Sequence, residues 1–438
     1  MPRMKFIASM LAIIAIGFGL IGCPSSGGGG GGDGQGSSST AFLYVANSGG
    51  NDISAYGVNT TTGVLTPLAG SPFAAGTNPQ AMILNASGSV AFASNAGSAD
   101  VSGYIVNTGT GVLTPASIPP FPAQATPQTL TLEPAEKFAF VANFGADSVS
   151  VYTVNTTTGI LTDVTGSPFS VAPATQPQQA TVVTVSPTVQ FVYLANAGSG
   201  NVSGFFINAT TGALTPATIG SPFPVGITPR LVVADSTGKF VYVSNEGSAT
   251  ISVLGVNQTN GALTTVAGAP FSAGTTPQPV TLHPTGLFAY VANAGSHNIS
   301  AYSVNASTGV LTRITNPDPL APDPNFFSAG TSPQRVTIDP TGRFAFVANS
   351  GSSNVSVYVI DQITGELTQV AGSPFAAGTQ PRRVTADPTG KFVFVPNAGS
   401  NNVSAYRLNA TTGFLTPVTG SPFAAGTGPR FVTTAGTF

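Results

Sequence analysis

The hexapeptide FLYVAN, residues 42–47, is the first of eight closely similar segments that are spread along the chain. Each segment ends in a string such as YVAN, FASN, FVAN, YLAN, YVSN or FVPN. The terminal asparagines are Asn47, Asn95, Asn143, Asn196, Asn245, Asn293, Asn349 and Asn397. Their successive spacings are 48, 48, 53, 49, 48, 56 and 48 residues. A period of roughly 20–50 residues indicates a repeat architecture such as a solenoid or a propeller.

A second segment, a proline followed by an apolar run, recurs with the same period. Its eight copies are NPQAMIL, TPQTLTL, QPQQATVV, TPRLVVA, TPQPVTL, SPQRVTI, QPRRVTA and GPRFVTT. The first YVAN segment has no such run before it, and the last run, in GPRFVTTAGTF at 428–438, has no YVAN segment after it. Head and tail are therefore two halves of one unit. We expect the C-terminal strand to pair with the N-terminal blade, which removes both exposed edges.

One unit contains four short strands in sequence. PRLVVA and KFVYVSN are joined by the turn DSTG, and strands of the type VSAYRLN and FLTPV are joined by ATTG, whose residue types suit tight hairpins. KFVYVSN is apolar on both faces, which is typical of a sheet that neighbouring sheets cover on both sides. The sequence therefore predicts an all-β fold, a β-propeller of eight four-stranded antiparallel blades over residues 41–438.

The first 40 residues differ from the repeats. Residues 1–22 have a basic start and an apolar run and are interpreted as a lipoprotein signal peptide, because LIGC at 20–23 resembles a lipobox whose Cys23 is acylated. A transmembrane anchor is the alternative, although the apolar run is short for a span. Residues 23–40 are rich in glycine and serine and predict a flexible tether. We expect a cell-envelope protein held by lipid, at the outer membrane or surface.

Composition excludes several site classes. Charged residues make up 6% of the chain and its net charge is −2, so no basic stripe for nucleic acid is expected. The two histidines and one cysteine are too few for a His/Cys metal site, and no metal or cofactor is predicted. His283 and His297 are interpreted as surface turn residues. The insert NPDPLAPDPN, 316–325, is interpreted as a stiff surface loop.

Positions at which one repeat departs from its sisters mark candidate site residues. Glu246 is the only charged residue that directly follows a YVAN asparagine. Arg230 follows the strand-opening proline of the same unit, and antiparallel pairing predicts that the two lie side by side at the channel mouth. The equivalent positions of other units predict a ligand-binding rim that contains Arg382, Arg430, Gln278 and Gln178.

TPRLVVADSTGKFVYVSNE, followed by ISVLGVNQTNGALT, resembles the repeat of the lactonase-type β-propellers, relatives of 6-phosphogluconolactonase and carboxymuconate cyclase. The YVAN segments also resemble the YVTN repeats of surface-layer propellers. The resemblance implies seven blades as the alternative to eight. It also implies catalytic roles for Arg230 and Glu246, the glutamate as base and the arginine holding a carboxylate or oxyanion. Leu231, Gln178 and Gln278 stand where the family pattern has histidine, histidine and arginine.

Two functions remain open at this point. The first is a lipid-anchored binding or scaffolding module, without catalytic activity, for a glycan, a small anionic ligand or an envelope protein, because glutamines and arginines at the channel mouth suit many neutral and a few charge-assisted hydrogen bonds. The alternative is a lactonase-like hydrolase of a sugar or related lactone. We expect a monomer that needs no cofactor and contacts the membrane only through its lipid.

Overall fold

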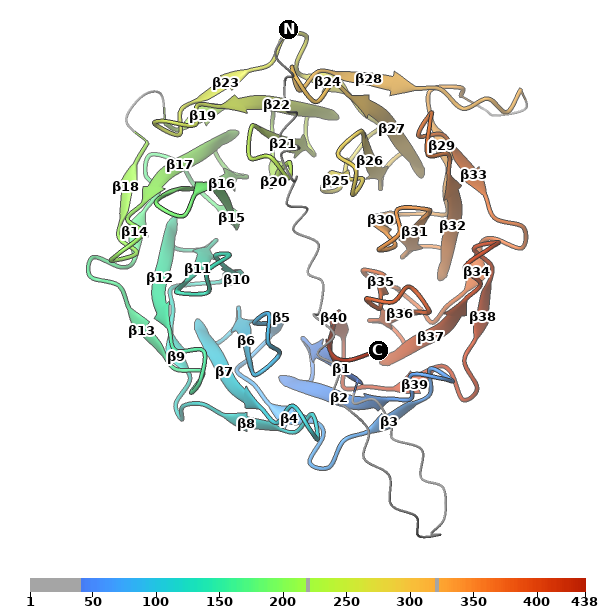
Figure 1. Ribbon diagram of the computed structural model, residues 1–438, viewed down its shortest axis with the longest axis horizontal. Coiled ribbons are helices and arrows are strands. Elements are labelled where there is room, and N and C mark those ends of the chain that lie inside the picture. The colour runs from blue at the N-terminus through green and yellow to red at the C-terminus, as the bar shows by residue number, and fades with distance from the viewer. Residues whose placement is uncertain (1–40, 218–220, 320–322) are drawn as a thin grey trace, which may run out of the picture. The chain divides into compact units, whose positions relative to one another are not determined.

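The computed structural model describes residues 41–217, 221–319 and 323–438, which form forty strands and no helix. No helix in this part of the chain could therefore cross a membrane. The strands form eight small antiparallel sheets, which stand around a central channel as blades of a propeller (Figure 1). The all-β class and the count of eight blades are confirmed. The signal peptide, tether and Cys23 lie outside the described residues.

We number the blades 1–8 along the chain and give their strands from the channel outward, with a short fifth strand last. Blade 1 contains β40 (Pro429–Gly436), β1 (Ala41–Asn47), β2 (Asp52–Val58), β3 (Leu65–Pro67) and β4 (Phe73–Ala74). Blade 2 contains β5 (Pro79–Leu84), β6 (Val90–Asn95), β7 (Asp100–Val106), β8 (Leu113–Pro115) and β9 (Phe121–Pro122). Blade 3 contains β10 (Pro127–Leu132), β11 (Phe138–Asn143), β12 (Ser148–Val154), β13 (Leu161–Asp163) and β14 (Phe169–Ser170). Blade 4 contains β15 (Pro177–Ser186), β16 (Val189–Asn196), β17 (Asn201–Ile207), β18 (Leu214–Pro216) and β19 (Phe223–Pro224).

The remaining blades follow the same order. Blade 5 contains β20 (Pro229–Ala234), β21 (Phe240–Asn245), β22 (Thr250–Val256), β23 (Leu263–Thr265) and β24 (Phe271–Ser272). Blade 6 contains β25 (Thr281–Leu282), β26 (Phe288–Asn293), β27 (Asn298–Val304), β28 (Leu311–Ile314) and β29 (Phe327–Ser328). Blade 7 contains β30 (Pro333–Ile338), β31 (Phe344–Asn349), β32 (Asn354–Ile360), β33 (Leu367–Gln369) and β34 (Phe375–Ala376). Blade 8 contains β35 (Thr385–Ala386), β36 (Phe392–Asn397), β37 (Asn402–Leu408), β38 (Leu415–Pro417) and β39 (Phe423–Ala424).

The C-terminal strand closes the ring as expected. β40 pairs antiparallel with β1, with Val432 opposite Val45 and Thr433 opposite Tyr44. The C-terminal strand β40 is therefore the innermost strand of blade 1, whose other strands come from the N-terminal repeat. Val432 is buried and packs with Leu43 and Val45 of β1 against Phe394 of blade 8.

The hydrophobic core lies between the blades. Each second strand from the channel is buried along nearly its whole length, as in β1 and β21. One face of β1 packs against blade 8, and its other face, through Phe42 and Tyr44, packs with Ala91 and Ala93 of blade 2. The two-sided apolar pattern of KFVYVSN arises because each blade is covered on both faces by its neighbours.

Each blade has the four expected strands and one more. The additional strand is two residues long, follows the fourth strand in the chain and pairs with the third. This short strand accepts a hydrogen bond from the next blade. The Tyr104 hydroxyl donates to the Ala74 carbonyl at 2.8 Å, and the Tyr152 hydroxyl donates to the Pro122 carbonyl at 2.6 Å. Where the next blade carries this tyrosine, the fifth strand therefore links a blade to its successor.

The recurring polar residues have structural roles. Asn95 is buried at the end of β6, and its amide donates to Asp100 Oδ1 at 2.6 Å and to Ser102 Oγ at 2.9 Å, which fixes the hairpin between β6 and β7. The glycine that ends the turn between the third and fourth strands packs against the preceding blade, as Gly111 of blade 2 shows. Gly111 has φ of 72°, and a Cβ there would lie 2.3 Å from a ring carbon of Phe42.

His283 was expected on the surface and is buried, which corrects that interpretation. Its Nε2 lies 2.8 Å from the Gly342 carbonyl of blade 7, and its Nδ1 lies 2.7 Å from Thr285 Oγ1. The turn that carries His283 packs against blade 7. A residue in this turn is therefore buried between two blades, although it lies at the end of a hairpin within its own repeat. His297 is exposed, as expected.

Candidate functional site

The first strand of each blade lines the channel, and in six blades a bulge lies near the start of this strand. In β20, Pro229 pairs with Asn245 and Val232 pairs with Val243, so Arg230 and Leu231 together face a single residue of β21. The extra residue of a bulge re-aims its neighbours. The same irregularity occurs in β10, β15 and β30, and a single extra residue stands at the same place in β5 and β40.

Hydrogen bonds between adjacent blades hold these strands in place. Thr131 Oγ1 donates to the Ala180 carbonyl at 2.8 Å, and Thr337 Oγ1 donates to the Val384 carbonyl at 2.8 Å. Equivalent bonds join blades 4 and 5, 6 and 7, and 8 and 1. Within the described residues, five of the eight junctions between neighbouring blades carry such a bond. These bonds hold together the channel-lining strands of blades 3, 4 and 5 and those of blades 6, 7, 8 and 1.

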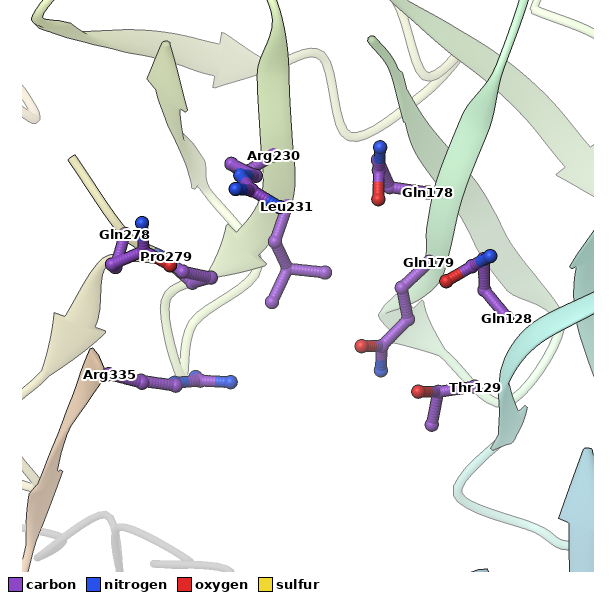
Figure 2. A pocket seen from close by; sticks show the side chains of 9 residues that line it. All are labelled: Gln128, Thr129, Gln178, Gln179, Arg230, Leu231, Gln278, Pro279 and Arg335. Atoms are coloured by element: carbon purple, nitrogen blue, oxygen red, sulfur yellow. The ribbon is translucent and has the colours of Figure 1, made fainter. Parts of the chain in front are cut away.

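A pocket of about 200 Å³ opens on this wall (Figure 2). It is lined by Gln128, Thr129, Gln178, Gln179, Arg230, Leu231, Gln278, Pro279 and Arg335. All of these lie one or two positions after a strand-opening proline, in blades 3–7. In Figure 2 the side chains of Arg335 and Gln179 extend into the space between the strands. The lining therefore offers amides and guanidinium groups for hydrogen bonding.

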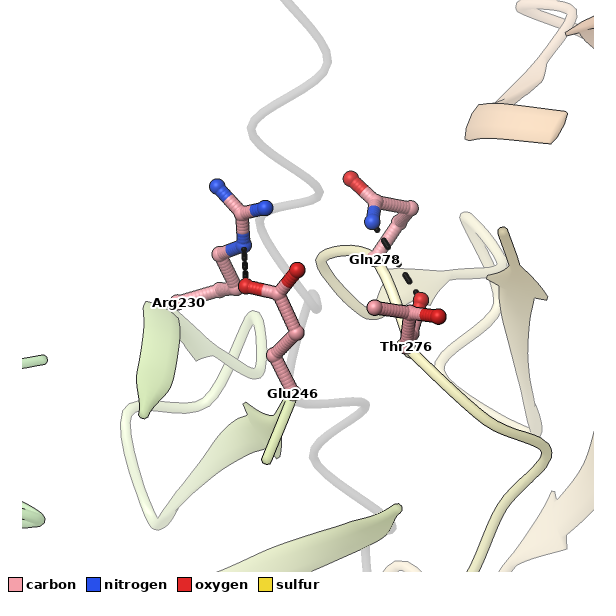
Figure 3. Close-up of polar contacts among 4 residues, drawn as sticks. All are labelled: Arg230, Glu246, Thr276 and Gln278. Carbon is pink, nitrogen blue, oxygen red and sulfur yellow. Dashed lines mark hydrogen bonds and ion pairs between the residues drawn. The ribbon is translucent and has the colours of Figure 1, made fainter. Parts of the chain in front are cut away.

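Arg230 and Glu246 lie side by side, as their spacing predicts. Arg230 Nε is 2.6 Å from Glu246 Oε2 (Figure 3). The two side chains are 38% and 21% exposed, so the pair remains accessible from the channel. An exposed pair of this kind contributes about 0–1 kcal/mol to stability. Its carboxylate can accept a proton and its guanidinium can hold an anion, which is the chemistry that a hydrolase of esters needs.

Gln278 of blade 6 adds an amide to the same pocket. Its Nε2 donates to the Thr276 carbonyl at 3.3 Å (Figure 3). Gln80 and Gln128 are tied in the same way to the residue two positions earlier, at 3.2 and 3.3 Å. In Gln278 and Gln128 this bond uses one amide proton, whereas Gln80 Nε2 also donates to Asn78 Oδ1 at 2.9 Å. In all three, the side-chain carbonyl is left to accept from a ligand.

Four further arginines lie on the channel-lining strands of blades 7, 8 and 1: Arg335, Arg382, Arg383 and Arg430. Arg335 Nε lies 3.5 Å from Thr281 Oγ1, and the Arg383 guanidinium carbon lies 5.2 Å from the ring centre of Phe431. No carboxylate of residues 41–217, 221–319 and 323–438 makes an ion pair with any of the four. The positive charge on this side of the channel is therefore uncompensated within the described residues.

The pKa values of these arginines reflect that arrangement. Desolvation in the channel, with the nearby guanidinium of Arg383, lowers the pKa of Arg335 to about 9. Desolvation also lowers the pKa of Arg383. A base whose pKa is lowered on folding costs stability while it stays charged, and a bound anion relieves that cost.

Charge is unevenly distributed around the ring. Blades 2, 3 and 4 present Gln80, Gln128, Gln178 and Gln179 to the channel, whereas blades 5, 7, 8 and 1 present the five arginines. Among the candidate residues, the structure brings Gln178, Arg230 and Gln278 together in one pocket, and Arg382 and Arg430 belong to the adjacent blades 8 and 1. Arg335 was not among the candidates. Reading the second position after each proline would have found it.

In the part of the chain that the structure describes, no group of three or more His, Cys, Asp or Glu side chains could hold a metal ion. Asp318 and Asp323 of the 316–325 insert belong to no such group.

Comparison with known proteins gives one family and many similar folds. The family described as "Lactonase, 7-bladed beta-propeller" matches residues 29–126, 123–327 and 266–433. A putative 6-phosphogluconolactonase from Bacteroides fragilis has TM-score 0.61 and 19% identity, covering 92% of this chain and 100% of that one. A periplasmic gluconolactonase from Pseudomonas aeruginosa has TM-score 0.59 and 16% identity, covering 91% and 99%. Apo AztD from Citrobacter koseri has TM-score 0.56 and 14% identity, covering 91% and 98%. No match was found among curated proteins.

Proposed function

The chain belongs to the lactonase family of β-propellers, and from that premise we propose that its channel binds a small polyhydroxylated carboxylate, such as an aldonic or uronic acid or the acidic end of a glycan. The observation that carries this proposal is the uncompensated arginine wall of blades 7, 8 and 1 beside glutamine-lined blades. Guanidinium groups bind carboxylates through paired, charge-assisted hydrogen bonds. Glutamine amides supply donors and acceptors for sugar hydroxyls.

The uneven charge supports an oriented ligand. The carboxylate would lie toward Arg335 and Arg383, and the hydroxyls would lie toward Gln178, Gln179 and Gln278 in the same pocket. A pocket of about 200 Å³ suits a monosaccharide-sized ligand or one terminal residue of a longer chain.

The test is titration of the chain with D-gluconate, D-glucuronate and uncharged D-glucose by calorimetry, with Arg335→Gln as the variant. We expect saturable binding of the two acids, which Arg335→Gln weakens by about 10- to 100-fold because one charge-assisted contact is lost. Affinity should fall as pH rises above about 9, where Arg335 of the free protein loses its proton. The same variant should have a higher unfolding midpoint at pH 7, because the lowered pKa makes the charged arginine a cost below pH 9.

Arg407→Gln is the matched control, since Arg407 is an exposed arginine on β37 of blade 8. It should change neither affinity nor stability. Equal binding of glucose and the acids, or acid binding that Arg335→Gln leaves intact, would refute the anionic-ligand proposal.

A second candidate function is lactone hydrolysis, favoured by the Arg230–Glu246 pair at the edge of the same pocket. In this reaction Glu246 takes a proton from water, the resulting hydroxide forms a bond to the lactone carbonyl carbon, and Arg230 stabilises the oxyanion. The ring C–O bond then breaks, and the leaving alkoxide takes up the proton to give the hydroxy acid. That product is itself a polyhydroxylated carboxylate.

We also propose that the protein is held at the cell envelope by acylation of Cys23, and acts there as a monomer toward a glycan or an envelope protein. The support is the LIGC motif after an apolar run and the glycine-rich residues that follow. Labelling of cells with a radioactive fatty acid should mark the wild-type protein and not Cys23→Ser. Label on both proteins would place the lipid on another residue. Label on neither would refute the lipid anchor.

A further inference from the structure

A tyrosine on the third strand links most blades to the blade before them. It occurs in six blades, as Tyr56, Tyr104, Tyr152, Tyr302, Tyr358 and Tyr406. Its hydroxyl donates in each case to the carbonyl of the last residue of the preceding fifth strand, namely Ala424, Ala74, Pro122, Ser272, Ser328 and Ala376. Each ring is buried in the gap between two blades.

Blade 5 lacks this ring. Its third strand carries Leu254 at the tyrosine position, and the preceding fifth strand ends at Pro224. Blade 4 has Phe205 there, which keeps the ring without the hydroxyl. Leucine is shorter than tyrosine and has no hydrogen-bond donor. In blade 5, Leu254 therefore neither fills the space that a tyrosine ring would take nor donates to the Pro224 carbonyl.

A pocket of about 250 Å³ lies at this point, between blades 4 and 5. Leu254, Pro224, Val225 and Pro270 supply apolar lining. The volume exceeds that of an engineered apolar cavity of about 150 Å³ that binds benzene. The space beside Leu254 is therefore large enough for a six-membered aromatic ring.

One side of the pocket is polar. Ser248, Thr250 and Ser252 also line it. Ser252 Oγ accepts from Asn245 Nδ2 at 3.0 Å, and the structure shows no acceptor for the Ser252 hydroxyl proton within the described ranges. A ligand that carries a hydroxyl group would therefore meet both a carbonyl acceptor and a hydroxyl donor in this pocket.

From this replacement of a ring by a cavity, we propose that the pocket between blades 4 and 5 is a binding site for a small phenol. The phenol ring takes the space that the tyrosine ring fills in six sister blades, and the phenol hydroxyl donates to the Pro224 carbonyl. This site is separate from the channel, and the phenol proposal does not depend on the function proposed for the channel.

The experiment measures binding of phenol and of benzene to the full chain by calorimetry, together with the shift of the unfolding midpoint. We expect saturable phenol binding, and about tenfold weaker binding of benzene, which lacks the hydroxyl. Leu254→Tyr should weaken phenol binding at least tenfold and raise the unfolding midpoint without phenol, because its own side chain fills the site.

Phe205→Tyr is the matched control, since it adds a hydroxyl at the same repeat position one blade away and should leave phenol binding unchanged. If Leu254→Tyr does not fold, Leu254→Phe fills the same space and is expected to block phenol in the same way. The proposal fails if the wild-type chain shows no saturable phenol binding, or if a folded Leu254→Tyr or Leu254→Phe variant binds phenol as well as the wild type does.

Discussion

Removal of residues 429–438 is expected to unfold the whole propeller instead of fraying one blade. These residues form β40, which is the innermost strand of blade 1 and pairs with β1 along seven positions. The deletion exposes the edge of β1 to water and removes Phe431, Val432 and Phe438 from apolar clusters. Full burial of one such side chain contributes about 1.5–3 kcal/mol. Val432 is buried and the two phenylalanines are partly buried, so the deletion costs several kcal/mol. This is comparable with the roughly 5–15 kcal/mol net stability of a folded domain.

Thermal unfolding followed by circular dichroism checks this expectation, with deletion of residues 437–438 alone as the control because it leaves β40 intact. The shorter deletion should lower the midpoint far less. A peptide of residues 429–438 added in excess should partly restore the larger truncation, because it can supply the missing strand. Hydrogen exchange that speeds up only in residues 41–74, with an unchanged midpoint, would show instead that blade 1 frays alone.

The second large effect concerns the Arg230–Glu246 pair. If the channel hydrolyses lactones, Arg230→Ala and Glu246→Gln should each lower kcat/KM for D-glucono-1,5-lactone by about 100- to 1,000-fold, since one removes oxyanion stabilisation and the other the base. The double variant should be little worse than either single variant, because the two groups act as a unit. Hydrolysis is followed by proton release in weakly buffered solution.

Glu366→Gln supplies the matched control, because it makes the same substitution in a turn between β32 and β33, away from the channel strands. It should keep wild-type activity. Lactone hydrolysis that is absent from the folded wild-type protein, or that Glu246→Gln leaves unchanged, would remove the hydrolase candidate. The carboxylate-binding proposal would still stand, since it depends on Arg335 and its neighbours.

The repeat count predicted the fold correctly because each blade is one period, and the unmatched head and tail identified the closing strand. The fifth strand was missed because a two-residue element such as Phe73–Ala74 has no periodicity of its own. Its signal was the phenylalanine that recurs after SP in most repeats. Burial of His283 was missed for a different reason, because a turn in one blade becomes interior only when the next blade covers it.

Contacts in the candidate site could be predicted from the sequence where both residues lie on paired strands of the same blade. Arg230 and Glu246 are joined by antiparallel pairing, so their contact followed from register. Arg335 escaped notice because a bulge, which the sequence does not display, turns the second residue after the proline toward the channel as well. The arginine wall depends on the order of blades around the ring, and no single repeat contains it.

The tyrosine bond that joins one blade to its predecessor has an evolutionary consequence. The tyrosine bond joins adjacent members of the circle, so a gene that gains one whole tyrosine-bearing repeat by unequal crossing-over gains one more such bond and loses none. The chain has eight such units, whereas the family it matches is described as seven-bladed. A duplicated blade then arrives with copies of its channel residues and is free to diverge. Arg382 and Arg430, which occupy equivalent positions in repeats that share GSPFAAGT, are two residues that such a copying event could produce together.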